Sequence, residues 1–248
     1  MVITCKSIST SHAANLLDYA AQKGELYEGH DPQELTEWLE WDAARYPKIK
    51  NTAFAIVINP SEDEHAERWD RGKWGDVALD VLEKMGLDKQ PYTIMWHPCT
   101  NSRQDAGKLP HLHIVVMRID DKKEKAISDK FIGLKATRVA NAITKEMGQK
   151  TAEEYRKEHI AELRKTINKA LQEMKDEGRR NFDPLVLAEK LGNSCEVVRK
   201  NNGTLQGFNL IHPKGAKFKL SELGKAYTLP NLEKAYRAQF SRHYTIKR

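Results

Sequence analysis

The stretch His111-Leu112-His113-Ile114-Val115-Val116 carries the most information about the fold and the site. Two histidines separated by one apolar residue open a run of β-branched side chains, which is typical of a buried strand. Alternate side chains of a strand share a face, so the two imidazoles point the same way, about 6.5 Å apart. Such a pair more often consists of ordinary core or surface histidines than of metal ligands. However, His97 ends an earlier apolar run, and if the two strands pair, three imidazoles can share one divalent ion.

Apolar patterning along the rest of the chain predicts an α+β fold. Val2–Ser9 alternates apolar with polar residues, and Thr52–Asn59 is a nearly continuous apolar run that stops at Pro60. Helical spacing of apolar residues recurs between these runs and after the histidine strand. We expect an antiparallel sheet with the helices packed on one face. The expected helices are Ala13–Lys23, Pro32–Tyr46, Trp74–Met85 and Leu134–Met147.

The chain is long enough for one main domain and a smaller appended module. Its 248 residues divide, on pattern, into a main domain over 1–150, a bridging helix over 151–180 and a small C-terminal α/β module over 181–248. Thr151 and Glu154 are expected to form a capping box at the start of the long charged helix. The turn signals Asn202-Gly203 and Pro213-Lys214-Gly215 separate short strand-like runs in the last part.

Composition limits the partners and the compartment. Lys and Arg total 41 against 35 Asp and Glu, and the sequence pI is about 9.0, so polyanions such as nucleic acid are favoured ligands. Cys5, Cys99 and Cys195 are few and widely spaced, which predicts neither a disulfide framework nor a zinc knuckle and fits a reducing cytoplasm. No apolar run approaches the roughly 18 residues that span a bilayer, so we expect no membrane insertion and no signal peptide.

A tyrosine is a candidate nucleophile for phosphate chemistry. Tyr19 is the best placed, because it lies early, on a helix that directly follows the first strand, and Tyr27 is its nearest rival. A phenol is a weak nucleophile at its ordinary pKa of about 10 and needs a neighbouring base or a polarised electrophile. Attack on a phosphodiester would give a phosphotyrosine that conserves the bond energy for religation. The alternative for any one tyrosine is a packing role.

Four segments in this order resemble the relaxases of conjugative and mobilisable plasmids, specifically the P-type mobilisation family of HUH endonucleases. The name describes two histidines separated by one hydrophobic residue. The C-terminal stretch 203–236 also resembles a small module that often follows such domains. The four segments are KSISTSHAANLLDYAAQKGE (6–25), KNTAFAIVINPSEDE (50–64), WHPCTNSRQDAGKLPHLHIVVMRID (96–120) and KEMGQ (145–149).

The resemblance implies a fold, a reaction and roles for individual residues. It implies a sheet of about five antiparallel strands that carries single-stranded DNA and a bound Mn²⁺ or Mg²⁺. Tyr19 takes the position of the catalytic tyrosine, and His97, His111 and His113 take the positions of the metal ligands. The reaction is a strand-specific nick at an origin of transfer that leaves a 5′-phosphotyrosyl intermediate. Where the family usually has an acid after the first histidine, this chain has Cys99, and Asp105 is the nearest substitute.

Basic and aromatic side chains supply candidate DNA contacts. Tryptophans Trp38, Trp41 and Trp96 are candidates to stack on bases, although tryptophans at helical spacing usually belong to a core. For each basic residue a solvated surface role is the alternative. The basic candidates are Lys48, Lys50, Arg103, Lys108 and Arg118, with Lys122, Lys123 and Lys125 nearby.

The resemblance also implies partners, and two other functions remain open. The implied partners are origin-of-transfer DNA, accessory relaxosome proteins and a type IV coupling protein. A replication initiator or transposase of the HUH class would share the metal site but use another tyrosine, such as Tyr27 or one near Tyr155. A catalytically inactive DNA-binding mobilisation accessory would bind the origin without nicking it.

Overall fold

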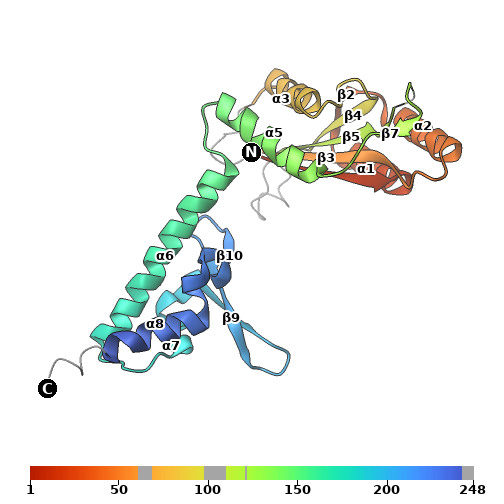
Figure 1. Cartoon of the computed structure of the whole chain (residues 1–248). Helices are drawn as coiled ribbons and strands as arrows, with labels where there is room; N and C mark the ends of the chain where they lie inside the picture. Colours follow the sequence, from red (N-terminus) through yellow and green to blue (C-terminus); the bar gives the residue numbers. More distant parts are fainter. Residues whose placement is uncertain (61–68, 98–109, 121, 242–248) are drawn as a thin grey trace. The chain divides into compact units, whose positions relative to one another are not determined.

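The computed structural model describes residues 1–60, 69–97, 110–120 and 122–241 (Figure 1). The chain forms two compact units, Met1–Ala152 and Glu153–Arg248. Each unit has its own hydrophobic core, one built from residues up to Met147 and the other from residues after Tyr155. Within the described part of the chain, no helix combines the length and apolar character needed to cross a membrane.

The first unit is built on a five-stranded sheet in the order β1-β3-β5-β4-β2, with every neighbouring pair antiparallel. This confirms the predicted α+β class and the five-stranded antiparallel sheet. The fifth strand is β2, which sequence patterning alone did not locate. The histidine strand β5 is central and pairs on both sides. The strands are β1 (Val2–Ser9), β2 (Glu25–Gly29), β3 (Asn51–Asn59), β4 (Tyr92–His97) and β5 (His111–Met117).

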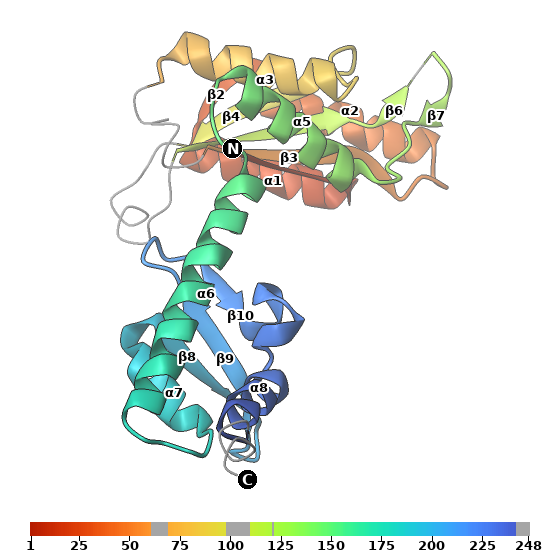
Figure 2. The ribbon, with the colours of Figure 1, turned by 60° about the vertical axis from the view of Figure 1, so that its left-hand side comes forward.

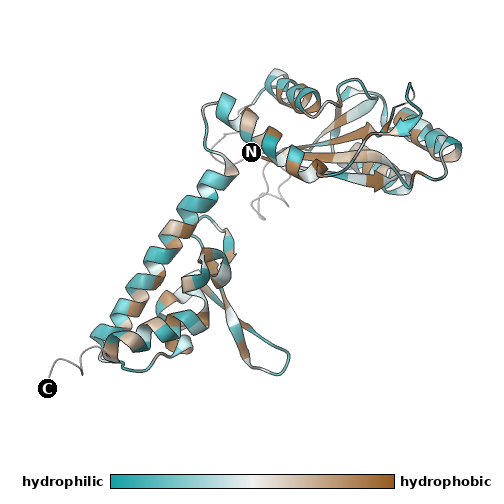
Figure 3. Cartoon of the chain, in the orientation of Figure 1, coloured by the Kyte–Doolittle hydropathy of each residue, from teal (hydrophilic) through white to brown (hydrophobic). Residues whose placement is uncertain are grey.

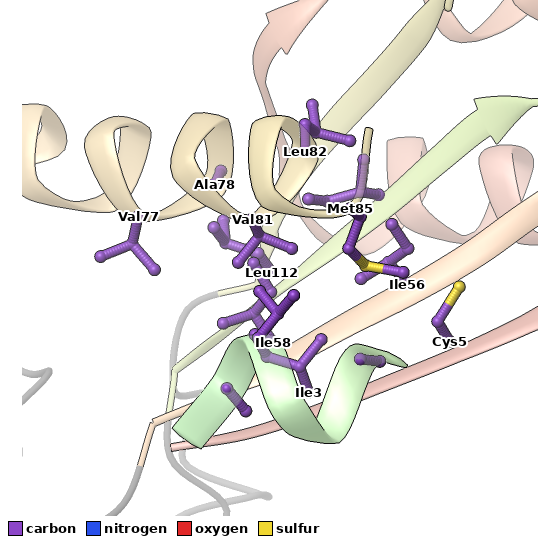
Figure 4. Packing of buried hydrophobic residues seen from close by; sticks show 14 of the residues in the cluster. Ile3, Cys5, Ile56, Ile58, Val77, Ala78, Val81, Leu82, Met85 and Leu112 are labelled. Atoms are coloured by element: carbon purple, nitrogen blue, oxygen red, sulfur yellow. The ribbon is translucent and has the colours of Figure 1, made fainter. Parts of the chain in front are cut away.

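One face of this sheet packs against helices α3 (Arg71–Lys84) and α5 (Ile132–Glu146). Alternate residues of the strands, such as Ile56 and Ile114, point into this core and are fully buried. Figure 4 shows the side chains of α3 meeting those of the strands. Figure 3 shows the strands as largely hydrophobic and the helices as mixed, as expected for strands buried between layers.

The other face packs against helices α1 (Thr10–Lys23) and α2 (Pro32–Arg45). Val115 and Met117 of β5 are buried there with Leu17 of α1 and Leu39 of α2. The expectation that all helices cover one face is therefore wrong. Over part of their length the strands carry apolar side chains on both faces of the sheet. Both faces are therefore covered by helices (Figure 2).

The start of α2 shows why this helix forms where it does. The Asp31 carboxylate accepts hydrogen bonds from the backbone N–H groups of Gln33 and Glu34, at 2.8 and 3.4 Å. Pro32 fills the first helical position, where the missing N–H costs nothing. Leu35 and Leu39, four residues apart, are then fully buried against the sheet.

Beyond β5 the first unit carries a small ribbon, β6 (Ile119–Asp120) and β7 (Lys125–Ala126), which leads to α5. The second unit has a three-stranded antiparallel sheet in the order β10-β9-β8. Helix α6, the expected bridging helix, buries Leu163, Ile167 and Met174 in this unit's core. The elements of the second unit are α6 (Ala152–Asp176), α7 (Pro184–Leu191), β8 (Cys195–Arg199), β9 (Leu205–Ile211), β10 (Lys217–Lys219) and α8 (Leu229–Ser241), with short 3-10 turns between them.

Candidate metal centre

Three histidines meet where β4 ends and β5 begins. His97 and His111 are register partners across the two strands, and His113 lies two residues further along β5 on the same face. The ring centroid of His97 lies 5.2 Å from that of His111 and 4.5 Å from that of His113. One ring nitrogen from each histidine lies within 4.8 Å of the others. Three imidazoles this close together form a donor set that suits a divalent transition metal.

His97 is buried, whereas His111 and His113 remain partly exposed. A site with one buried and two half-exposed ligands keeps an open side toward solvent. An open side is what a catalytic metal needs, because substrate oxygen must reach the ion. The residues present therefore fit a divalent metal.

Tyr19 lies beside the histidines. It projects from α1, and its ring lies edge-on to His97 with the centroids 5.7 Å apart. Leu17, two residues earlier, is fully buried against the sheet and anchors this part of the helix. Tyr19 itself is 41% exposed, so its phenol is accessible from solvent.

The backbone at Gly24 approaches His97 closely. It joins α1 to β2, next to Glu25, which is the register partner of Trp96. A Cβ atom at Gly24 would lie 2.4 Å from His97 Cδ2 and 2.5 Å from the Trp96 carbonyl oxygen. Only glycine leaves room for the His97 ring at this junction. No sequence pattern pointed to this role of Gly24, because it depends on a close approach of two strands in space.

The sheet face beside the histidines is partly uncovered. One row across the sheet consists of Thr4, Val57, His113, Met95 and Leu26. Thr4 and Leu26 at the two edges are exposed, and Val57 beside His113 is half-buried. The first-unit helices thus leave an accessible surface on both sides of the histidines.

A comparison with protein-family models matches residues 18–149, more than half of the chain, to the family described as "Relaxase: MobA/VirD2-like, nuclease domain". The matched range contains Tyr19 and all three histidines. The chain belongs to the MobA/VirD2-like relaxase family. Searches of the curated proteins and of the solved structures gave no match. The family assignment confirms the resemblance drawn from the sequence and indicates a DNA endonuclease of the nickase type.

Tyr27, the other candidate tyrosine of the relaxase domain, has a packing environment. Its hydroxyl accepts a hydrogen bond from the Gly75 N–H at 3.1 Å, and the Arg71 guanidinium lies over its ring. Tyr27 packs with the core on the α3 side of the sheet, away from the face that carries the histidines. Burial raises the pKa of its phenol, which disfavours the nucleophilic phenolate.

The two cysteines within the described part of the relaxase are poor nucleophiles. Burial raises the pKa of the Cys5 thiol to about 12 and that of Cys195 to about 11. Both are free thiols. Tyr19, by contrast, is exposed and lies against His97.

Three of the predicted basic DNA contacts lie in the described part of the chain, and all three lie away from the histidines. Lys48 and Lys50 are exposed between α2 and β3, at the end of the sheet opposite to the histidines. Arg118 is engaged within the protein: it pairs with Asp129 at 3.1 Å and donates hydrogen bonds to the carbonyl oxygens of Ile127 and Asn51. Asp105, Arg103 and Lys108 lie outside the described residues.

Proposed function

We propose that this relaxase is a metal-dependent, site- and strand-specific DNA nickase that uses Tyr19 as its nucleophile at an origin of transfer. The observation that supports this most directly is the placement of the Tyr19 ring 5.7 Å from His97, within a cluster of three imidazoles. Nucleophile and metal donors come from three separate segments of the chain and meet at one accessible point. A purely structural histidine cluster would not need an exposed tyrosine beside it.

The proposed reaction is a transesterification. The Tyr19 oxygen attacks the scissile phosphorus, the bond between phosphorus and the 3′ oxygen breaks, and the DNA is left with a free 3′ hydroxyl. The phenol loses its proton and the departing 3′ oxygen gains one. The 5′ phosphate stays on Tyr19 as a phosphodiester, so the later religation needs no external energy source.

His97, His111 and His113 would hold the metal ion, Mn²⁺ or Mg²⁺, which when bound neutralises charge on the scissile phosphate. Helix α1 holds the tyrosine through buried Leu17, so the phenol approaches from a fixed direction. The uncovered face beside His113, with Thr4, Lys6 and Val57, offers a surface for single-stranded DNA. Lys6 supplies a positive charge there for a phosphate.

The same proposal includes the setting of the reaction. We expect the enzyme to act in conjugation or mobilisation, with accessory relaxosome proteins and a type IV coupling protein as partners. Packing of Tyr27 on the opposite side of the sheet argues against a replication initiator or transposase that would use it. The inactive accessory protein is the alternative that the following experiment separates.

The test incubates the full chain with a pool of single-stranded oligonucleotides of randomised sequence in Mn²⁺ or Mg²⁺. Covalent adducts are isolated under denaturing conditions, their DNA is sequenced, and the modified peptide is located by mass spectrometry. We expect one dominant junction sequence and a 5′ phosphate on Tyr19. Removing the nucleophile in Tyr19→Phe should abolish the adduct.

Tyr27→Phe is the matched control and should keep the adduct. His111→Ala should weaken Mn²⁺ binding, measured by calorimetry, in parallel with adduct yield. No adduct from the wild-type chain in either metal, or an undiminished adduct in Tyr19→Phe, would contradict the proposal. Specific DNA binding without any adduct would instead identify a non-catalytic accessory protein.

A further inference from the structure

A second candidate site lies at the end of β5 that is remote from the histidines. It is a cleft of about 560 Å³ between α2 and the ends of β4 and β5. Its lining combines two indoles, two carboxyl groups and two apolar side chains. The lining residues are Glu37, Trp38, Trp41, Asp42, Pro91 and Met117.

The cleft lies on the same sheet face as the metal centre but is separate from it. Met117 and His113 share a face of β5, four residues apart, which corresponds to about 13 Å along a strand. Residues of α1 and α2 pack over Val115 between the two places. A strand of DNA longer than a few nucleotides could therefore reach both sites.

The lining suits a flat, amino-bearing ring. Indole faces are good stacking surfaces for bases, and Trp41 is 56% exposed, an unusual exposure for the largest apolar side chain. Glu37 is exposed, so its carboxyl group is accessible at the mouth, whereas Asp42 is fully buried in the wall. Carboxylates accept hydrogen bonds from the exocyclic amino groups of bases.

Cationic side chains come directly after the cleft residues of α2 in the chain and are not part of the lining. The Arg45 guanidinium lies 5.0 Å from the centre of the Trp41 ring and pairs with Glu124. Lys48 and Lys50 follow directly after the helix and are exposed. Carboxyl groups inside the cleft repel a phosphate, whereas the neighbouring cations attract one. This charge arrangement fits a nucleotide whose base enters and whose phosphate stays outside.

We infer that this cleft binds one unpaired base that carries an amino group, cytosine, adenine or guanine, from the single-stranded DNA substrate. The inference rests on the proposed function, because it takes single-stranded DNA as the ligand. Thymine has no exocyclic amino group, and its exocyclic oxygens are hydrogen-bond acceptors, as are the carboxyl oxygens. The cleft is a specificity site that selects a base at a fixed distance from the nick.

The experiment measures binding of the full chain, in EDTA to prevent cleavage, to a labelled oligothymidylate and to the same oligomer with one central thymine replaced by cytosine. A single amino-bearing base should increase affinity about tenfold. Trp41→Ala should remove that gain, because about tenfold in affinity is typical of one base stacked on an aromatic ring. Phe131→Ala, which truncates another exposed aromatic residue, is the matched control and should leave the gain intact.

A second variant tests the carboxyl group without touching the core. Glu37→Gln should reduce the preference for cytosine over thymine, and Glu40→Gln, exposed on the same helix but outside the lining, should not. Equal affinity for the two oligomers, or an unchanged gain in Trp41→Ala, would overturn the inference. Binding of an oligoarginine peptide that depends on Trp41, with no base preference, would identify a cation site instead.

Failure of this inference and failure of the proposed function are distinguishable. Tyr19→Phe and His111→Ala should lose the covalent adduct and keep the preference for cytosine. A wild-type chain that forms the adduct but shows no base preference retains the nickase function and loses the base site. A chain with the preference but no adduct leaves a DNA-binding protein with a base-selective cleft.

Discussion

At the residue scale, the candidate centre depends on how His97 is held. Its ring lies beside those of His111, His113 and Tyr19, and a Cβ atom at Gly24 would lie 2.4 Å from it. His97 is the last residue of β4, so its backbone is fixed by pairing with β5. The ring therefore has little freedom to adjust to a change in any neighbour.

Gly24→Ala is expected to weaken metal binding. The new methyl group would lie within 2.4 Å of the His97 ring and must push it aside. Changing a residue that orients a metal ligand typically lowers metal affinity by about 10- to 100-fold. Calorimetric titration with Mn²⁺ measures the effect. Gly133→Ala on α5, whose added methyl meets only an ordinary 3.7 Å contact, is the control and should bind like the wild type. Unchanged affinity in Gly24→Ala would show that His97 is not a ligand.

The three histidines and Tyr19 could be singled out from the sequence because their signals are local: a spacing of two in a strand and a tyrosine on the first helix. The structure brings these four side chains together. The role of Gly24 could not be predicted, because it depends on how closely β2 approaches β4 in space. Arg118 was predicted to contact DNA but pairs with Asp129, and no pattern in the neighbouring sequence indicates that ion pair.

At the element scale, short polar strands were the hardest to predict. Strand β2 has the sequence ELYEG, lies at the edge of the sheet and is mostly exposed, so no apolar alternation marks it. The long central strands were predicted because burial on both faces requires nearly continuous apolar runs. Covering the second face with α1 and α2 could not be predicted, because each helix has one apolar stripe that fits either face.

Helix α5 begins at an unusual residue, and this gives a prediction for stability. Phe131 precedes the helix with φ of 59°, a left-handed conformation, and its side chain makes no capping hydrogen bond and is 69% exposed. Phe131→Asn should raise the free energy of unfolding by about 0.5 to 1 kcal/mol, because asparagine tolerates this conformation better. Phe131→Ala keeps the strain and should give no such gain. Denaturant unfolding followed by tryptophan fluorescence measures both, and equal stabilities would contradict the prediction.

At the scale of the whole molecule, each unit carries its own core and its own polar network. In the second unit, His159 on α6 stacks on His212 with ring centroids 3.8 Å apart. His212 Nε2 lies 2.7 Å from a Glu162 carboxylate oxygen, and its Nδ1 accepts a hydrogen bond from the Lys214 N–H. These contacts attach α6 to the turn between β9 and β10.

The second unit should lose stability in mild acid. Burial, followed by the neighbouring His212, lowers the pKa of His159 from 6.5, so the folded unit favours the neutral ring. The stabilisation is present above about pH 6.5 and is lost as the pH falls toward the lowered pKa of the folded state. We expect an effect of less than about 1 kcal/mol, because the ring is partly exposed.

Amide hydrogen exchange of β9 between pH 7 and 5, corrected for intrinsic rates, measures this loss. His159→Phe keeps a ring in the stack but removes the titration, so its exchange should show a smaller dependence on pH. The hydrogen bond with His212 is the main reason that the pKa of Glu162 is lowered from 4.5. The stabilisation that Glu162 contributes is therefore lost only below about pH 4.5. The same pH dependence in wild type and His159→Phe would assign the effect to other groups.

The central position of β5 has a consequence for how the enzyme handles its substrate. His111 and His113 belong to the middle strand of the five, and the interior strands are the part of a sheet that opens last. The histidine positions are consequently preset and do not form around a substrate. We therefore expect the DNA backbone to adjust to the protein, which would favour sequences that bend easily at the scissile step even where no side chain contacts their bases.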